Sequence, residues 1–314
     1  MSGDTADRIS AAVRRREALV AGLRDTDAWR WVHGGDDGCP GFTLDQLGQV
    51  LLVEQHRPDV DGNDFAAAVS RVFPGMPVFI KQRWEKDRSG ARQVAGEPAA
   101  AAFDVTEAGL RYGVDLDRGE HVGFFLDGRA ARAFVRARAE GRRVLNLFAY
   151  TGAFGVAAAA GGARSTVNID NKESALREAA QNYRRNGLAA DARTFFRCDV
   201  LYYLKRAAGQ KGRFDLIIVD PPPAFRRHRM ADFEADRHLD RLLTACMAIA
   251  EEKGTILAGL NSPRGDWSLL DDMIDRAAAL SGRTVHRLPR VEADGDFPGC
   301  TDRPVARFQP FEII

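Results

Sequence analysis

Long apolar runs, paired cysteines and an excess of one charge are all missing from this chain of 314 residues. No apolar run reaches the roughly 20 residues that a membrane-spanning helix needs. The polar start, Met1 to Arg8, has no signal-peptide core. The four cysteines show no C-x-x-C spacing and are too few for a disulfide scaffold. These absences predict a cytoplasmic protein with reduced thiols, no membrane association and no bound metal.

Charge is almost balanced, with 45 Lys and Arg against 44 Asp and Glu, so composition alone gives no nucleic-acid signal. Arginines nevertheless gather in four places, which are residues 14–16, 136–143, 184–185 and 226–229. Solvated helix faces are the ordinary interpretation of such clusters. The cluster at 226–229 is the exception, because it directly follows a proline run and would face whatever enters a cleft there.

The pattern of expected elements divides the chain near residue 138. The elements of the first part are a helix at 7–24, a strand at 49–53, a helix at 64–73, a strand at 78–84, a hairpin at 103–116 and a helix that reaches about 139. We therefore expect a smaller N-terminal α+β domain over residues 1–138, followed by a second domain over 139–314.

In the second part, strands and helices alternate, which is typical of a parallel sheet covered on both faces. The expected strands are 144–148, 165–169, 193–197, 214–219, 254–259, 284–289 and 304–313. The expected helices are 153–161, 172–186, 200–208, 231–250 and 266–281. Because only a short loop joins the last two strands, they must be antiparallel, and a reversed final strand is typical of methyltransferase sheets.

The most informative stretch runs from Val144 to Gly155, where an apolar strand enters a glycine-containing turn and an Ala-rich helix. The next strand ends in Asp170, about 20 residues after the turn, where an acid can accept both ribose hydroxyls of a nucleoside. A dinucleotide enzyme would show G-x-G-x-x-G, and this turn has fewer glycines, so no pyrophosphate is expected. With Asp220-Pro-Pro222 at a later strand end, the pattern favours S-adenosylmethionine as the cofactor.

An ordered set of motifs carries a family resemblance. The set consists of Glu107, Gly123–Arg129, Leu145–Gly152, Gly162–Thr166, Asn186–Leu188 and Asp220–Pro222. It resembles the class I methyltransferases that act on large-subunit ribosomal RNA. The likeness is closest to the guanine-N7 half of the bifunctional large-subunit enzyme, and next to the cytosine-C5 enzymes with a fused PUA domain. It covers about Trp29 to the C-terminus, and no THUMP or PUA module is recognisable in the sequence.

The resemblance implies a Rossmann-like α/β fold, with a seven-stranded sheet and a reversed last strand. It also implies a set of cofactor-binding residues at the strand ends, namely Asp127, Arg129, Phe148, Tyr150, Thr151, Gly152, Asp170, Asn171, Asp199, Val200 and Asp220. In this set Asp170 binds the ribose and Asp199 accepts from the adenine amino group. Alternative roles stay open, because both acids could cap a helix, and Asp127 and Arg129 could form a buried ion pair.

The substrate side is expected at Asp220, Pro221 and Pro222. Proline fixes φ and removes backbone donors, so this corner is stiff and rich in hydrogen-bond acceptors. It would hold an exocyclic amine while Phe225 stacks on the base, although Phe225 stands one position later than the aromatic of the family and could pack in the core instead. Further RNA-contact candidates are Arg83, Arg226, Arg227, Arg229, Asn261 and Arg264.

The chemistry of methyl transfer limits which atom of the base can be the target. Methylation of a pyrimidine carbon requires a thiolate nucleophile, and no cysteine lies beside Asp220 or in the loop after strand 254–259. Guanine N7 has an exposed lone pair and needs no base. We therefore expect methylation of guanine N7 in ribosomal RNA or a pre-ribosomal particle, by a protein that could form a homodimer. A methyltransferase for a small molecule or protein amine, and a non-catalytic scaffold, stay open as alternatives.

Overall fold

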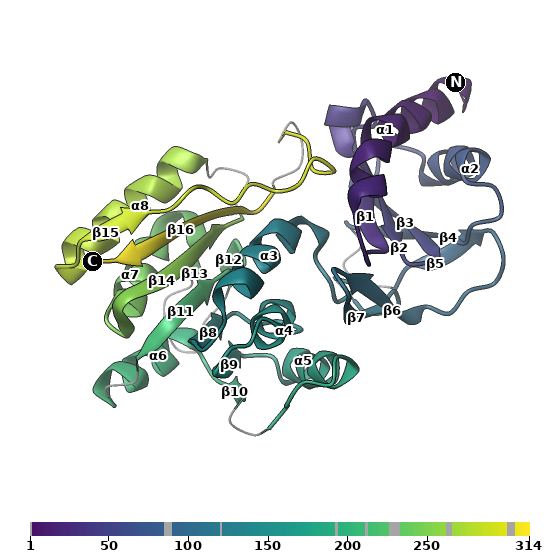
Figure 1. Cartoon of the computed structure of the whole chain (residues 1–314). Helices are drawn as coiled ribbons and strands as arrows, with labels where there is room; N and C mark the ends of the chain where they lie inside the picture. Colours follow the sequence, from purple (N-terminus) through teal and green to yellow (C-terminus); the bar gives the residue numbers. More distant parts are fainter. Residues whose placement is uncertain are drawn as a thin grey trace. The chain divides into compact units, whose positions relative to one another are not determined.

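The structure is a computed structural model that describes residues 2–84, 90–119, 121–191, 194–210, 213–225, 233–261, 266–299 and 305–314 (Figure 1). Its backbone groups into two compact units. The first comprises Met1–Asp127 and Asp294–Pro304, and the second comprises Gly128–Ala293 and Val305–Ile314. A division into folding domains at residue 138 stays a prediction.

No helix within the described ranges is long and apolar enough to cross a bilayer. Nor do those ranges bring together three or more His, Cys, Asp or Glu side chains in an arrangement that could hold a metal ion.

A five-stranded sheet forms the centre of the first unit, in the order β1-β2-β3-β4-β5. Its strands are β1 (Ala28–His33), β2 (Phe42–Leu47), β3 (Val50–Gln55), β4 (Val78–Gln82) and β5 (Arg92–Ala95). Strands β3 and β4 are parallel, whereas the other pairs are antiparallel. Helices α1 (Ser2–Gly22) and α2 (Gly62–Val72) share an apolar core with this sheet. The short helices η1 (Gly34–Asp37) and η2 (Leu126–Gly128) and the hairpin β6 (Ala102–Glu107) and β7 (Leu110–Asp115) complete the unit.

Strands β1 and β2 were not predicted, and their buried polar side chains are the reason. Arg30 Nε and Nη2 donate to the two carboxylate oxygens of Asp45 at 2.6 and 2.9 Å. These residues are partners in the β1–β2 register. Because the pair places charges on one face of the sheet, the alternation of apolar residues that identifies a strand is broken.

The segment that begins at Asp294 returns to the first unit through Asp296, which is fully buried. The Asp296 carboxylate accepts from the Arg30 amide at 3.0 Å, and its carbonyl accepts from Arg16 Nε at 3.3 Å. The Arg30 guanidinium lies 4.8 Å from the centre of the Phe297 ring. This segment is therefore fixed in the first unit by hydrogen bonds and by cation–π contact.

A buried ion pair joins α1 to η1. The Arg16 side chain is 2% exposed, and its Nη1 and Nη2 donate to Asp37 at 3.0 and 2.7 Å. Asp37 also accepts from Arg15 Nη2 and from the His33 amide, both at 2.6 Å. Burial alone would raise the pKa of the Asp37 carboxyl, but hydrogen bonds from Arg16 and Arg15 outweigh burial and hold that pKa below its ordinary value.

A seven-stranded sheet forms the second unit, in the order β10-β9-β8-β11-β14-β16-β15. Its strands are β8 (Arg143–Leu147), β9 (Ser165–Asp170), β10 (Phe195–Arg197), β11 (Phe214–Val219), β14 (Ala250–Leu260), β15 (Val285–Arg287) and β16 (Arg307–Ile313). Only β16 runs against its neighbours. This arrangement confirms the expected class I methyltransferase sheet with a reversed last strand.

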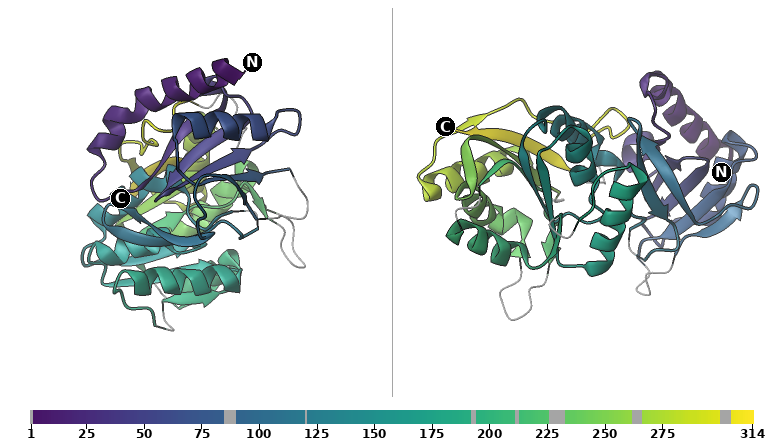
Figure 2. Two further views of the ribbon diagram at one scale, coloured as in Figure 1. Left: turned by 90° about the vertical axis from the view of Figure 1, so that its right-hand side faces the viewer. Right: turned by 60° about the horizontal axis from the view of Figure 1, so that its bottom comes forward.

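Helices cover both faces of this sheet (Figure 1, Figure 2). The helices are α3 (Arg129–Arg138), α4 (Ala153–Ala160), α5 (Glu173–Arg185), α6 (Val200–Gly209), α7 (Ala235–Met247) and α8 (Trp267–Ser281). Side chains on alternate positions of the strands enter different cores, as the two-residue period of a strand requires. Leu145 and Ile217 join the core under α6, α7 and α8, whereas Val144 and Leu216 join the core under α3 and α4.

Several expected boundaries are wrong, including the start of the helix predicted at 7–24, which begins at Ser2. Two of the larger differences lie in the second unit. The helix predicted at 231–250 spans Ala235–Met247, and the strand predicted at 254–259 begins earlier, at Ala250. An irregularity in pairing explains the second difference, since Phe214 pairs with Ala250 whereas Leu216 pairs with Thr255. The connection between β15 and β16 is also longer than the expected short loop, because it includes the segment that groups with the first unit.

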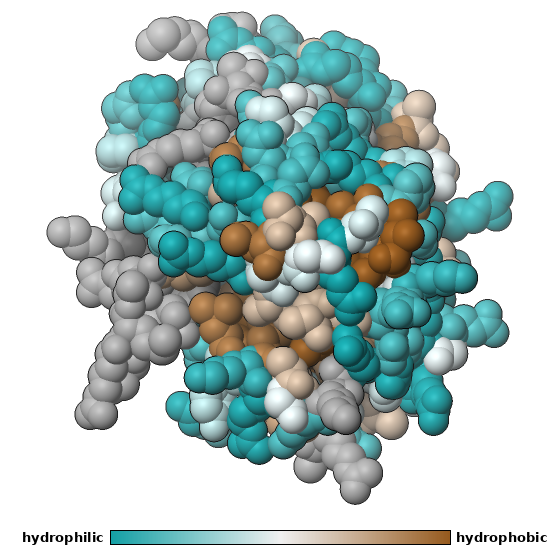
Figure 3. Space-filling view, turned by 90° about the vertical axis from the view of Figure 1, so that its left-hand side faces the viewer, coloured by the Kyte–Doolittle hydropathy of each residue, from teal (hydrophilic) through white to brown (hydrophobic). Residues whose placement is uncertain are grey.

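One face of the protein is largely hydrophilic, with hydrophobic residues gathered near its centre (Figure 3). Three of the exposed large apolar side chains of the second unit are Tyr202, Leu280 and Ile314, at 56%, 67% and 68% exposure. They come from α6, α8 and the C-terminus. Single exposed apolar side chains of this kind are ordinary on protein surfaces.

The buried ion pair predicts how acid affects stability. Asp37→Asn should lower the unfolding free energy at neutral pH by about 3 kcal/mol, because it leaves the buried charge of Arg16 without its partner. Since the folded-state pKa of Asp37 is depressed, its contribution is present above the unfolded-state pKa and is lost as pH falls through the folded one. Urea unfolding followed by tryptophan fluorescence at stepped pH measures both effects.

The matched control is Asp59→Asn, which removes an exposed ion pair with Arg57 in the same unit. We expect this variant to unfold like the unmodified protein, because exposed pairs contribute little. If the Asp37 and Asp59 variants behave alike at every pH, the ion pair does not have the stabilising role that its burial indicates.

Candidate active site

The register of the central strands brings the predicted acids to one edge of the sheet. Leu147 on β8 pairs with Ile169 on β9 and with Val219 on β11. Asp170 and Asp220 are the residues that follow these partners, so they flank the start of the turn after β8. Neighbouring strands lie about 4.8 Å apart, which puts the two acids roughly 10 Å from each other at the backbone. They therefore belong to one rim.

The turn between β8 and α4 is strained. Phe148 and Tyr150 have φ values of +56° and +49°, and Gly152 has +75°. A left-handed conformation costs a residue other than glycine about 1–3 kcal/mol, so such residues persist only where surrounding contacts hold them. Here the Ala149 amide donates to Ile169 O at 2.9 Å, and the Gly152 amide donates to Ala149 O at 2.8 Å. The buried Thr151 carbonyl accepts from Asn182 Nδ2 at 2.9 Å.

Asp170 is the acid that holds this turn. Its Oδ2 accepts from the Tyr150 amide at 2.9 Å, while its Oδ1 accepts from the Lys172 amide at 2.8 Å. Asp170 therefore acts in part as a helix cap, because Lys172 directly precedes α5. A carboxylate offers about four lone-pair sites, and these two bonds leave acceptor capacity for ribose hydroxyls. Asn171 lies between Asp170 and Lys172 in the chain, and it is exposed.

Asp199 caps α6, with its Oδ1 accepting from the Tyr202 amide at 2.9 Å. It follows β10, whose Arg197 pairs with Asp170, and Val200 begins the helix and is buried. The cap interpretation is correct here too. An additional role for this carboxylate in binding an adenine amino group stays a prediction.

Asp220 lies on the β14 side of the rim. A Cβ atom placed on Gly259 would come within 3.0 Å of Asp220 Oδ1, so the carboxylate fits against β14 only because this position is glycine. Pro221 is buried, whereas Pro222 is exposed. The Pro223 carbonyl accepts from the Ala235 amide at 2.8 Å, which ties the proline corner to the start of α7. This contact fixes the corner in addition to the restricted φ of proline.

The proline corner continues into a two-stranded hairpin, β12 (Ala224–Phe225) and β13 (Phe233–Glu234). Phe225 pairs with Phe233. The buried Phe233 ring lies 6.5 Å from the Phe148 ring, so the hairpin and the cofactor turn share an aromatic contact. The Phe225 side chain lies outside the described part of the structure, and its stacking role stays a prediction.

The other candidates divide between the two units or lie outside the described residues. Asp127 groups with the first unit, while the buried Arg129 groups with the second. Arg83 also belongs to the first unit, with its Nε 3.6 Å from Glu54 Oε1. Asn261 follows the end of β14 in the second unit. The candidates outside the described residues are Arg226, Arg227, Arg229 and Arg264.

A buried polar network below the turn was not predicted. Asn146 Nδ2 donates to Asn168 Oδ1 at 2.9 Å, and Asn168 Nδ2 donates to the Tyr183 hydroxyl at 3.0 Å. Tyr183 in turn donates to Thr166 at 2.8 Å, and its burial raises the pKa of the phenol to about 12. Asparagines within two apolar strands are the sequence signal that could have identified this network.

The network explains why residue 155 is a glycine. A Cβ at this position would come within 2.2 Å of Asn168 Oδ1 and 2.5 Å of the Tyr183 hydroxyl. The second glycine of the turn motif is therefore required for close packing of α4 on β9 and α5.

Comparison with known proteins identifies relatives over nearly the whole chain. Residues 63–309 match the family described as S-adenosylmethionine-dependent methyltransferase. The ribosomal RNA large subunit methyltransferase I of Erwinia tasmaniensis is 34% identical over 305 residues, which cover 95% of this chain and 76% of that protein. Its Escherichia coli namesake is 29% identical over 279 residues, or 87% and 70% of the two chains. The crystal structure of SMU.776 with SAH superposes with a TM-score of 0.90 at 25% identity, covering 99% and 81%.

Because the turn is strained, we expect that adding one methyl group to it has a large effect on cofactor affinity. In Gly152→Ala, the new Cβ would lie 2.8 Å from the Ala179 Cβ, in addition to the strain of the positive φ. We expect the affinity for S-adenosylmethionine, measured by titration calorimetry, to fall at least about tenfold, since 1.4 kcal/mol of distortion is enough for this change.

Gly187→Ala is the matched control, because Gly187 has a φ of +66° and open space around its Cβ position. It should lose about 1 kcal/mol of stability and keep its cofactor affinity. Unchanged affinity in both variants would show that the turn does not contact the cofactor.

Proposed function

The chain belongs to the family of S-adenosylmethionine-dependent methyltransferases, and we propose that it methylates N7 of a guanine in large-subunit ribosomal RNA. The likeness to the Erwinia tasmaniensis enzyme carries the RNA part of this proposal, because it extends over 95% of the chain. The choice of base and atom is supported by the chemistry of the residues around Asp220 and by the positions of the cysteines.

The carboxyl rim of the second unit fits the cofactor. The backbone of the Phe148–Gly152 turn is fixed by hydrogen bonds within the protein, and Gly152 leaves no side chain in the way. Asp170 has acceptor capacity beside this turn, as hydroxyl groups require. We assign the turn to the methionine end, Asp170 to the ribose and Asp199 to the adenine. The bound cofactor supplies a methyl group activated by the positive charge of its sulfonium.

The corner at Asp220 fits an amine-bearing planar base. Its carboxylate accepts hydrogen bonds, and three consecutive prolines without backbone N–H groups add only acceptors. Guanine presents an amino group and an imino N–H along one edge, so this corner would hold that edge and orient the base. Because N7 has an exposed lone pair, orientation is the main contribution required of the protein.

The cysteines argue against methylation at a pyrimidine carbon, which needs a thiolate. Cys246 is fully buried and Cys39 belongs to the first unit. Cys198 directly precedes the adenine-side Asp199, and burial, together with that carboxylate, raises the pKa of its thiol. None of these three cysteines lies beside Asp220, and Cys300 falls outside the described residues.

Mapping the transferred methyl group tests the proposal. Purified protein and methyl-labelled S-adenosylmethionine would be incubated with unmodified large-subunit RNA, with pre-ribosomal particles and with a whole-cell small-molecule fraction. We expect label in the RNA and strand scission at one guanine after borohydride and aniline treatment, because N7 methylation makes that base labile. Label on a cytosine carbon would contradict the proposed atom, and label confined to small molecules or protein would contradict RNA as the substrate.

Asp220→Ala separates substrate positioning from cofactor binding. We expect methyl transfer to fall by at least about 100-fold, the loss typical of removing one polar group that acts in the transition state. The dissociation constant of S-adenosylmethionine should change by less than about threefold, because Asp220 lies on the β14 side of the rim. Single-turnover kinetics and calorimetry measure the two quantities. Equal losses in both would place Asp220 in the cofactor site instead.

A further inference from the structure

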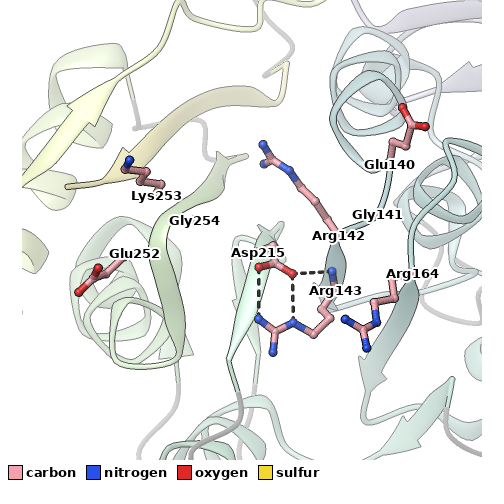
Figure 4. Close-up of a pocket in the computed structure, with 9 residues that line it drawn as sticks. All are labelled: Glu140, Gly141, Arg142, Arg143, Arg164, Asp215, Glu252, Lys253 and Gly254. Carbon is pink, nitrogen blue, oxygen red and sulfur yellow. Dashed lines mark hydrogen bonds and ion pairs between the residues drawn. The ribbon is translucent and has the colours of Figure 1, made fainter.

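A cavity of about 490 Å³ lies at the opposite edge of the same sheet, in the second unit (Figure 4). Its walls come from the amino ends of β8, β11 and β14 and from the residue before β9. Arg142, Arg143, Arg164 and Lys253 line it, with Asp215 on β11 between them. The cavity shares no residue with the rim that holds the cofactor, so it calls for a separate explanation.

Among the cations of the cavity, Arg143 is the one with an ion pair in the described part of the structure. Its Nε and Nη2 lie 3.1 and 3.2 Å from the Asp215 carboxylate oxygens, and its Nη2 is also 2.6 Å from Glu251 Oε1. These bonds make Arg143 and Asp215 a fixed wall of the cavity. Hydrogen bonds from Arg143 are also the main reason that the pKa of Asp215 lies below its ordinary value.

The remaining cations have unused donors. Arg142 makes one side-chain hydrogen bond, from Nη1 to Thr255 Oγ1 at 3.0 Å. Arg164 and Lys253 have no side-chain hydrogen bond or ion pair within the described ranges, and both are exposed. In Figure 4, the carboxylates of Glu140 and Glu252 extend away from the space between the strands, while Arg142 extends into it. The four cations that line the cavity therefore outnumber its three carboxylates, Glu140, Asp215 and Glu252, by one, and Arg143 is also bonded to Glu251 just outside the lining.

The backbone holds these cations in place. The Arg164 amide donates to Arg142 O at 2.9 Å, so the two arginines stand side by side at the starts of neighbouring strands. Lys253 projects from the irregular part of β14 with a φ of +61°. For a lysine this left-handed conformation costs about 1–3 kcal/mol, and strain of this kind is concentrated at functional positions.

We propose that this cavity binds phosphate groups of the RNA backbone, an inference that rests on RNA being the substrate. Arginine and lysine with free donors are the side chains that bind phosphate. Two strand spacings, or roughly 10 Å at the backbone, separate Arg142 from Lys253, which favours a chain of phosphates over one small anion.

The position of the cavity also specifies the kind of RNA. Strand β8 has five residues, so the cavity and the cofactor rim lie about 17 Å apart along the strand. An RNA that offers a base at one edge must be large and folded to reach the other. A short oligonucleotide containing the target base occupies only the rim.

The test compares the double variant Arg164→Glu/Lys253→Glu with Arg241→Glu/Lys205→Glu. Arg241 and Lys205 are exposed on α7 and α6, so the control pair makes the same change in net charge elsewhere on the second unit. Equilibrium binding to large-subunit ribosomal RNA would be measured over a series of salt concentrations. Methyl transfer would be measured on that RNA and on a short oligonucleotide with the target base. Calorimetry with S-adenosylmethionine and thermal unfolding would show that each variant is folded.

We expect the Arg164/Lys253 variant to bind the long RNA at least about tenfold more weakly than the control pair. The slope of log affinity against log salt should fall by about 1 for each lost phosphate contact. Cofactor affinity and activity on the oligonucleotide should not change, and Arg164→Lys should retain most of the long-RNA affinity.

Equal RNA binding by the two double variants would overturn the phosphate site while leaving the proposed function intact. RNA binding that depends on the cavity, without methyl transfer to RNA, would support the site and contradict the proposed function. Absence of RNA binding by the unmodified protein would overturn both.

Discussion

The hydrogen bonds of the Asp170 carboxylate are the constraint on which the cofactor site depends. They fix the amide of Tyr150 in a turn with three left-handed residues and the amide of Lys172 at the start of α5. Two of those residues carry side chains and would not adopt this conformation unaided. Contacts within the protein therefore hold the turn in this conformation. Asp170, which the sequence predicts as a ribose ligand, therefore also has a structural role in holding the turn.

The buried polar network below this turn holds two strands and α5 together. Asn146, Asn168 and Tyr183 connect two strands with α5 in an interior that is otherwise apolar. An unpaired polar group there would cost about 1–3 kcal/mol, so the network admits few alternative registers. Gly155 lets α4 approach it closely. The network thus fixes β8 and β9 against α5, and Asp170 stands at the end of β9.

The pattern of apolar residues predicted the seven strands of the large sheet in the second unit, but it did not predict β1 and β2 in the first. Strands such as β8 and β11 are buried on both faces and therefore read as continuous apolar runs. Strands β1 and β2 bury charged side chains, among them Arg30 and Asp45, whose pairing depends on register and is not visible along the chain. The acids of the rim were predictable because they directly follow apolar strands. The hydrogen-bonded turn and the buried network depend on contacts between distant residues, and they required coordinates.

The two proposed sites lie at opposite edges of the sheet and use different chemistry, so a net charge of +1 is compatible with the proposed RNA substrate. At the carboxyl edge we assign Asp170, Asp199 and Asp220 to hydroxyl and amino groups of the ligands, and these carboxylates would repel phosphates at short range. The rim can thus recognise a nucleoside or a base but cannot supply affinity for the backbone. Electrostatic attraction to RNA has to come from another surface, and the amino edge, with Arg142, Arg164 and Lys253, is such a surface. A balanced composition is therefore compatible with the proposed RNA substrate.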